Sequence, residues 1–447
     1  MDKKILAIAV VAIVVVAGIA AAVILMNKGD EQKEQILTHR LLLMGNVYSD
    51  DTINDNDVTV LQAMVDGKEK IKVAGNEIDL TTSDIKKYAD VNQDKKIDSK
   101  DISTLKDIIN GKATKVFYEN AKGEITSVKV PMNNLLIMFR RVGTTVAMVG
   151  ASDMVKGFIS DLAPGGNYGF LGFKGENLGS GSEPDYEKIK EMDSTYKSSG
   201  GVTLIADATG SAANLEEKVG PGIDVVRMPV TEGSTSEHGV VTLGYLLAYN
   251  NDNHDQIMEK LNKWISWTDS AKKTILDAVA KMKDADKKTC IVGMYNASAS
   301  TATINIRGPG QAEHDYSVEC GGNNLCTGKG PSYTYAELNE YLLSANPEYV
   351  FIMQQETYLL KSKISAQTTY DEFMTHISDN YKGKIGVFSQ FFGSGPGYIL
   401  SMMYYANVLV PELKDHFDLE KEYKFFMGDL VGNKELAEIS AFVPMSS

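Results

Sequence analysis

A loop in the first quarter of the chain concentrates carboxylate side chains directly before an apolar helical stripe. Its first, third, fifth, seventh, ninth and twelfth positions are Asp90, Asn92, Asp94, Lys96, Asp98 and Asp101. Like charges this close together repel one another, so the loop is costly unless a hard cation neutralises it. The spacing is that of an EF-hand loop, in which the seventh residue binds through its backbone carbonyl. The sequence therefore predicts one strong Ca²⁺ site here.

Two residues depart from an ideal calcium loop. Lys95 stands where glycine usually eases the turn, and Asp101 replaces the glutamate that usually binds through both oxygens. The alternative to a calcium site is a solvated acidic loop that caps the following helix through Asp98 or Asp101.

The same pattern occurs twice in the chain. The segments "GNVYSDDTINDNDVTVLQAMVDGK" (45–68) and "ADVNQDKKIDSKDISTLKDIINGK" (89–112) align without gaps. In the first copy the six positions read Asn46, Tyr48, Asp50, Thr52, Asn54 and Asp57. Charged side chains remain at Asp50 and Asp57, so the first copy is predicted to be a degenerate site that binds Ca²⁺ weakly or not at all.

The duplicated loop and helix, with aspartate at the last ligand position, resembles a dockerin module over residues 41–112. The resemblance implies folding that depends on Ca²⁺ and docking to a cohesin-domain partner. The docking contacts would come from Asp55, Asn56, Ser99 and Lys100. An insertion between the repeats and a position beside a membrane segment are unusual for dockerins, so a plain spacer between membrane and lobes is the alternative.

The beginning of the chain carries a membrane signal. Lys3 and Lys4 precede an uncharged run from Ile5 to Met26, long enough to span a bilayer as a helix. We predict a cytoplasmic tip at residues 1–4, an uncleaved anchor at 5–26, a linker at 27–40 and an extracellular remainder. A signal peptide cleaved near residues 20–22 is the alternative.

Composition restricts the partners of the remainder. The 447 residues contain 45 basic and 59 acidic side chains, a net charge of −14, which argues against a nucleic-acid partner. An extracellular location permits a disulfide between Cys320 and Cys326. Metal ligation by these two residues with His314 is the alternative.

From Lys115 onward, apolar strands alternate with helical stretches, which predicts parallel α/β sheets. A hairpin is predicted in "KVFYENAKGEITSVKVP" (115–131), and strands are predicted in "TTVAMVGAS", "GVTLIAD", "DVVRMPV", "TCIVGMYN", "EYVFIMQ" and "KIGVFSQ". Residues 253–285 have apolar residues at helical spacing, including Ile257, Leu261 and Trp264. The predicted architecture is two Rossmann-like lobes, 113–252 and 286–447, joined by one long helix.

This part resembles the class of periplasmic binding proteins whose lobes are joined by a helix and that serve ABC importers. The similarity lies in the hairpin, in "VAMVGASDMVKGF", "GENLGSGSEPDYEKIKEM", "ECGGNNLC", "TYAELNEYLLSANPEYVFIMQ" and "GPGYILSMMYYANVLVPELKDHFDLEKEY". Glu348 stands where the family usually has aspartate. The resemblance implies capture of an iron chelate, haem or corrinoid, delivery to a permease and an ATPase, and no catalysis.

Ligands of two-lobed α/β proteins lie at the carboxyl ends of the strands, in the crevice. That rule selects polar and aromatic side chains of the corresponding loops. They are Ser152, Asp153, Tyr168, Phe170, Lys174, Asp207, Thr209, Glu232, Ser234, Asn296, Arg307, His314, Gln354, Gln355, Glu356, Phe391, Phe392 and Tyr398. Aromatic rings with a few cations suit a bulky anionic chelate or a flat macrocycle. A dockerin-borne component of a cell-surface assembly and an enzyme on the same scaffold are the other functions considered.

Overall fold

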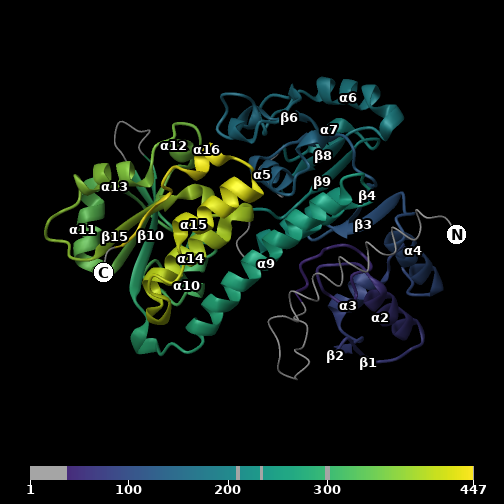
Figure 1. The fold of residues 1–447 in the computed structure, drawn as a ribbon, viewed down its shortest axis with the longest axis horizontal. Coiled ribbons are helices and arrows are strands. Elements are labelled where there is room, and N and C mark those ends of the chain that lie inside the picture. The colour runs from purple at the N-terminus through teal and green to yellow at the C-terminus, as the bar shows by residue number, and fades with distance from the viewer. Residues whose placement is uncertain (1–37, 208–211, 232–234, 297–302, 446–447) are drawn as a thin grey trace.

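The computed structural model describes residues 38–207, 212–231, 235–296 and 303–445 (Figure 1). The predicted membrane anchor at 5–26 lies outside these ranges. Within them, no helix is both long enough and apolar enough to cross a membrane.

The duplicated pattern forms a small module beside the hairpin and the long helix (Figure 1). Its elements are α2 (Asp55–Val65), β1 (Lys70–Val73), β2 (Asn76–Asp79), α3 (Ser83–Ala89) and α4 (Ser99–Ile109). Helices α2 and α4 pack together, and each begins with a capping box at equivalent positions, Asn54 with Asp57 and Asp98 with Asp101. The insertion forms the antiparallel hairpin β1–β2 and helix α3. The sequence repeat is thus a structural repeat.

The first lobe has a five-stranded parallel sheet and an antiparallel hairpin. The hairpin strands are β3 (Lys115–Glu119) and β4 (Ile125–Lys129), as predicted. The sheet has the order β7-β6-β5-β8-β9, with β5 (Leu135–Ile137), β6 (Val155–Phe158), β7 (Glu176–Asn177), β8 (Thr203–Ala206) and β9 (Asp224–Arg227). Its helices are α5 (Arg140–Met148), α6 (Tyr186–Thr195), α7 (Leu215–Val219) and α8 (Ser236–Ala248).

One predicted strand is wrong. The segment "TTVAMVGAS" (144–152) forms the second half of helix α5 and the turn after it, and the strand of this region is β5 instead. Eight of the nine α5 residues are buried, including the polar Arg141, Thr144 and Thr145. The predicted strand begins at Thr144, so it leaves out the two arginines that complete the helical spacing of these polar residues. Threonine and valine, which favour strands, strengthen the misleading signal.

Helix α9 (His254–Val279) runs along the molecule between the lobes (Figure 1). Its buried side chains include Ile257, Leu261, Trp264 and Ile275, which confirms the predicted stripe. The helix ends at Val279, and a short 3₁₀ turn at Asp284–Asp286 leads into the second lobe.

The second lobe has a seven-stranded mixed sheet in the order β13-β11-β10-β14-β15-β16, with β12 beside β10. Its strands are β10 (Thr289–Asn296), β11 (Thr303–Ile306), β12 (Asn323–Asn324), β13 (Ser332–Thr334), β14 (Tyr349–Gln354), β15 (Lys384–Ser389) and β16 (Phe442–Val443). Strands β10, β14 and β15 are parallel, as predicted. The helices are α10 (Ala312–Glu319), α11 (Tyr335–Ala345), α12 (Glu356–Leu360), α13 (Ala366–Met374), α14 (Tyr398–Leu409), α15 (Leu419–Lys424) and α16 (Lys434–Ala437).

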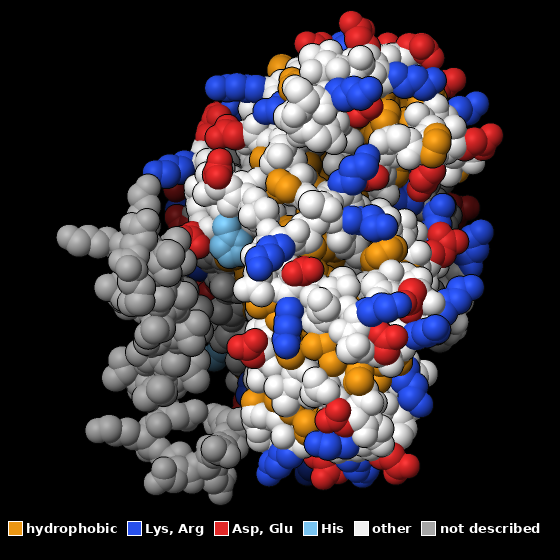
Figure 2. All heavy atoms as spheres, turned by 90° about the vertical axis from the view of Figure 1, so that its right-hand side faces the viewer, with side chains coloured by type: hydrophobic (Ala, Val, Ile, Leu, Met, Phe, Trp, Pro, Cys, Tyr) orange, Lys and Arg blue, Asp and Glu red, His pale blue; other side chains and the backbone are white. Residues whose placement is uncertain are grey.

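The module is joined to the lobes rather than held away from them. Backbone hydrogen bonds connect Met44 to Phe117 and Glu119 to Leu42, so residues 42–44 lie as a third strand beside the β3–β4 hairpin. One apolar core runs from the module through the first lobe to α9 and α14. Figure 2 shows acidic and basic side chains interspersed over the visible face that carries the module, without a large patch of one sign.

Arg40, which the sequence places in the linker, is buried at the junction. Its guanidinium forms ion pairs with Asp51 of the module, with Glu237 of α8 at 3.1 Å and with Asp269 of α9 at 2.6 Å. Burial lowers the pKa of Arg40, but hydrogen bonds to Asp51 and Asp269 outweigh burial and raise it. We call Arg40, Asp51, Glu237 and Asp269 the junction ion cluster.

All three cysteines are buried, and none forms a disulfide. The Cys320 thiol donates to the Met402 carbonyl at 3.4 Å, and the Cys326 thiol donates to the Gly328 carbonyl at 3.6 Å. The disulfide that an extracellular location would permit is therefore absent between these two residues.

Candidate functional site

A buried ion cluster joins the two lobes where strands β5 and β14 end. Arg140 and Arg141 begin α5 directly after β5, and Glu356 begins α12 after β14. Arg141 donates to Glu356 Oε2 at 2.9 Å, and Arg140 Nε lies 3.0 Å from Glu356 Oε1. The Tyr168 hydroxyl also donates to Glu356 Oε2, at 2.7 Å. We call these four residues the interlobe ion cluster.

Aromatic rings surround this ion cluster. Tyr168, Phe170 and Phe391 contact one another, with ring centroids 5.7 to 6.1 Å apart. Arg141 lies over the Phe391 ring, 5.2 Å from its centroid, and donates to the Phe391 carbonyl at 2.5 Å. Arg141, Tyr168 and Phe391 are all buried, so this part of the crevice is filled by protein side chains.

An open pocket of about 550 Å³ remains between the lobes. Its walls come from the segment after β9 in the first lobe and from the β11–α10 region and the 393–394 turn in the second. The lining residues are Thr231, Thr235, Arg307, Gly310, Gln311, Ala312, Glu313, Asp315, Tyr316, Glu319, Gly393 and Ser394. We call this the interlobe pocket, and its volume suits a small organic or metal-chelate ligand.

Arg307 gives the pocket one cation with spare donor capacity. Its Nε lies 3.7 Å from Glu313 Oε2 and, within the described chain, has no hydrogen-bond partner. Its Nη2 contacts the Met294 sulfur at 3.3 Å, a weak acceptor. Glu313, Asp315 and Glu319 supply negative charge, and burial raises the pKa of Glu319. The lining therefore offers both signs of charge to a ligand.

Comparison with known proteins identifies the architecture. No protein-family model and no curated protein matches the chain. Among solved structures, the TroA-like periplasmic binding protein FepB from Veillonella parvula matches with a TM-score of 0.54 at 12% identity, covering 74% of this chain and 99% of that one. This chain has the TroA-like binding-protein fold.

Two further structures match less well. A periplasmic solute binding protein from Veillonella parvula has a TM-score of 0.49 at 13% identity, with 71% of this chain and 93% of that chain covered. Molybdate-bound MolA from Haemophilus influenzae has a TM-score of 0.48 at 13% identity, with 70% and 97% covered.

In this TroA-like fold, few of the predicted ligand residues meet. Arg307 lines the interlobe pocket, while Tyr168, Phe170, Phe391 and Glu356 belong to the filled interlobe contact. Thr209, Glu232 and Ser234, and the side chain of Asn296, lie outside the described residues. Their ligand contacts stay predictions.

Other predicted ligand residues are engaged within the protein. Tyr398 donates to Glu237 at 2.7 Å, Gln354 donates to Thr369 at 2.7 Å, and Phe392 stacks on Phe442. His314 is buried, with Nδ1 2.8 Å from Asp315 and Nε2 3.1 Å from the Cys326 carbonyl. Both of its ring nitrogens are thus occupied. Of the remaining predicted residues, Asp207 is buried beyond the end of β8, Gln355 is the residue before α12, and Lys174 is exposed.

The strand error at 144–152 also misplaces Ser152 and Asp153. Because α5 runs back from the carboxyl end of β5, these two residues precede β6 and lie at the amino ends of the strands. The crevice end is occupied by Arg140 and Arg141 instead, which the sequence reading missed. The sequence feature that could have identified these two residues is an arginine pair directly after the apolar run "LLIMF".

The predicted calcium loop is closed by hydrogen bonds from its backbone amides to its own carboxylates. Asp90 accepts hydrogen bonds from the amides of Asp94 and Lys95, at 3.1 and 2.9 Å. Lys95 has a φ of 71°, the left-handed conformation that glycine usually supplies at this position. Asp101 is buried and accepts from the amides of Asn92 and Asp98 at 3.2 and 2.9 Å. Lys95 therefore adopts the backbone conformation usual at this position, while both Asp101 oxygens are bound to backbone amides.

The donor set fits calcium in type and order, since four carboxylates, one amide and the Lys96 carbonyl occupy the required positions. Within the described chain, however, no group of three or more His, Cys, Asp or Glu side chains is arranged to hold a metal. The loop carboxylates are turned to backbone amides.

The first copy of the loop is closed by its own hydrogen bonds. Tyr48 is buried, and its hydroxyl accepts from Asn76 at 2.9 Å, while Asp57 accepts from the amides of Tyr48 and Asn54 at 2.9 Å each. Burial raises the pKa of Asp57 to about 7. The insertion supplies Asn76, so packing holds this copy together.

Proposed function

We propose that this chain is the membrane-anchored, extracytoplasmic solute-binding component of an ABC importer. It captures a metal chelate, such as an iron chelate, haem or a corrinoid, and delivers it to a permease and an ATPase. It catalyses no reaction and does not bind nucleic acid. The run at 5–26 supplies the anchor.

The observation that carries this proposal is the interlobe pocket in a TroA-like fold. The pocket is built from both lobes and lies at the crevice, where solutes of two-lobed α/β proteins bind. Arg307 provides a donor for an anionic group of the chelate, and Glu313 with Asp315 can face a cationic one.

Substitution of Arg307 by glutamine tests the site. In the full chain, at least one of haem, cyanocobalamin and a ferric catecholate is expected to bind, and Arg307→Gln should weaken that binding by about tenfold or more. Trp264 reports on the event, because its indole donates at 2.7 Å to the Pro396 carbonyl, close to the pocket wall at 393–394. A Trp267→Phe background isolates the Trp264 fluorescence.

Lys197→Gln is the matched control, since Lys197 is an exposed cation of the first lobe outside the pocket lining. Its affinity should equal that of the parent chain. Binding of none of the three probes, or equal loss in both variants, would contradict the proposed site.

We also propose that residues 90–101 bind one Ca²⁺ ion through Asp90, Asn92, Asp94, the Lys96 carbonyl, Asp98 and Asp101. What supports this is the ligand order, together with the left-handed Lys95. Binding requires the carboxylates to exchange backbone amides for the ion. The first copy, with Asp50 and Asp57, is proposed to add little.

Calcium at a hundredfold excess over its Kd should stabilise the chain by about 2.7 kcal/mol, and chelation should reverse the gain. Asp90→Ala with Asp94→Ala should abolish the gain, as followed by thermal unfolding. Asp50→Ala, at the first-copy position equivalent to Asp94, is the control and should keep it. A gain that survives the double variant would contradict calcium binding at this loop.

Cohesin docking is the second candidate function, as a component of a cell-surface assembly. Asp55, Ser99 and Lys100 are exposed at the starts of α2 and α4, as such docking requires. Pull-down with a purified cohesin domain, with and without Ca²⁺, distinguishes docking from a plain spacer.

A further inference from the structure

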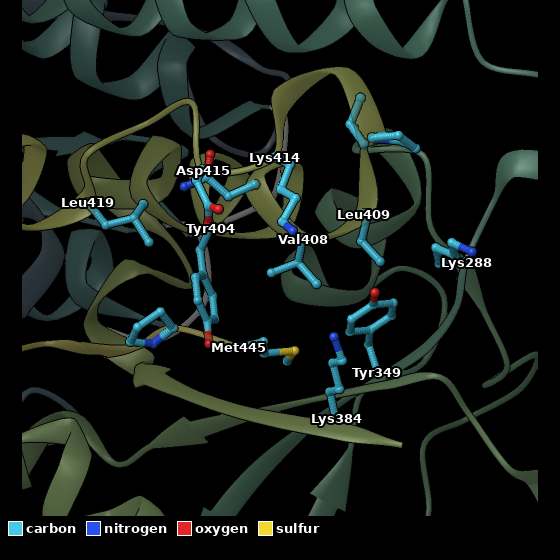
Figure 3. A pocket seen from close by; sticks show the side chains of 14 residues that line it. Lys288, Tyr349, Lys384, Tyr404, Val408, Leu409, Lys414, Asp415, Leu419 and Met445 are labelled. Carbon is cyan, nitrogen blue, oxygen red and sulfur yellow. The ribbon is translucent and has the colours of Figure 1, made fainter. Parts of the chain in front are cut away.

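A separate cavity of about 220 Å³ lies in the second lobe, at the amino ends of its parallel strands (Figure 3). This is the opposite edge of the sheet from the crevice. Its lining comes from the residues that begin β10, β14 and β15, from the end of α14 and from the segment after β16. The lining residues are Lys288, Tyr349, Lys384, Tyr404, Asn407, Val408, Leu409, Val410, Pro411, Lys414, Asp415, Leu419, Pro444 and Met445.

Two lysines give this cavity unneutralised positive charge. Figure 3 shows the Lys384 and Lys414 side chains extending from opposite walls, with their ammonium groups toward the cavity. Neither ammonium forms an ion pair or hydrogen bond with a described residue, whereas Lys288 is paired with Glu348 at 3.3 Å. Asp415 is the acidic residue of the lining. Two unpaired lysines against one aspartate leave one net positive charge in the lining, which favours a ligand with one negative charge.

The rest of the lining is largely apolar. Val408, Leu409, Leu419 and Met445 surround the space between the lysines (Figure 3). Tyr349 adds an aromatic ring, and its hydroxyl makes no hydrogen bond within the described chain. A cavity of about 150 Å³ can hold a benzene ring, so this cavity has room for a ring with a carboxylate.

We propose that this cavity binds a small organic monoanion with an apolar body, of the size of an aromatic carboxylate. Lys384 and Lys414 hold the carboxylate, and the apolar wall of α14 and Met445 covers the body. The site is independent of the interlobe pocket and of the proposed transport function.

Benzoate is the probe, titrated into the full chain and followed by calorimetry and by the ¹³C-methyl NMR signal of Met445, which Met445→Leu assigns. We expect saturable binding that shifts this methyl group. Lys384→Met with Lys414→Met should weaken the affinity by about tenfold or more, because two charge-assisted hydrogen bonds are lost. Lys190→Met with Lys197→Met, two lysines of the first lobe, should leave the affinity unchanged.

Two further probes separate the parts of the proposal. Benzyl alcohol keeps the ring without the charge, and acetate keeps the charge without the ring, so both should bind more weakly than benzoate. The lysines could instead serve to offset the negative end of helix α14. In that case benzoate would not shift the Met445 methyl, and the double variant would lower stability alone, which would overturn the proposal.

Discussion

Replacing Glu356 with leucine is expected to lower the free energy of unfolding by about 3–5 kcal/mol, the usual cost of removing one partner from a buried ion pair. The change leaves Arg141 and the Tyr168 hydroxyl without their shared acceptor in the interlobe ion cluster. Arg140 contributes less, since its side chain is 36% exposed and solvent screens its charge. Urea unfolding followed by circular dichroism measures the loss.

A second variant tests whether the loss of stability comes from leaving the Arg141 guanidinium buried without its carboxylate partner. Arg141→Met with Glu356→Leu removes both buried charges, and it should recover part of the lost stability. Glu412→Leu is the control, because Glu412 pairs with Lys281 on the surface, and it should cost less than about 1 kcal/mol. A loss in Glu356→Leu no greater than in the control would show that the interlobe ion cluster does not hold the lobes together.

The second large effect is expected at the junction ion cluster. Arg40→Met should destabilise the module's attachment by about 3 kcal/mol or more, because it leaves the buried Glu237 and the Asp51 and Asp269 carboxylates facing one another. Lys272 and Tyr398 still contact Glu237, at 2.7 Å each, so Glu237 keeps two of its partners in this variant. Burial alone would raise the pKa of Glu237, and these neighbours lower it.

Native-state hydrogen exchange measures this effect locally. Amides of α2 and α4 should exchange faster in Arg40→Met, while those of β14 and β15 should be unchanged. Lys70→Met is the control, since Lys70 pairs with Glu77 on the exposed β1–β2 hairpin. Uniformly faster exchange across the whole chain would mean that the module does not open separately.

Much of the fold could be predicted from local patterns. The module, the hairpin, the parallel strands and helix α9 each have a repeat, a turn or a period that a short window of sequence contains. Helix α5 was missed because the predicted strand begins at Thr144 and leaves out Arg140 and Arg141, which complete the helical spacing of its polar side chains.

The candidate site could not be predicted in the same way, because it depends on contacts between residues far apart in the sequence. Arg141 and Glu356 are 215 residues apart in the chain, and Arg40 is 197 residues from Glu237. The rule that ligands lie at strand ends selected Arg307, Tyr168 and Phe391, but it could not say which loops would meet and fill the crevice. That outcome depends on how the two lobes pack against each other and against α9.

The strand-like pairing of Leu42 and Met44 with the β3–β4 hairpin also has a mechanical consequence. Tension that enters from the N-terminal end reaches the ion pairs of Arg40 first and this pairing next, before it can load either lobe. Those contacts would be loaded in shear, so they would resist a force on the module before either lobe begins to unfold.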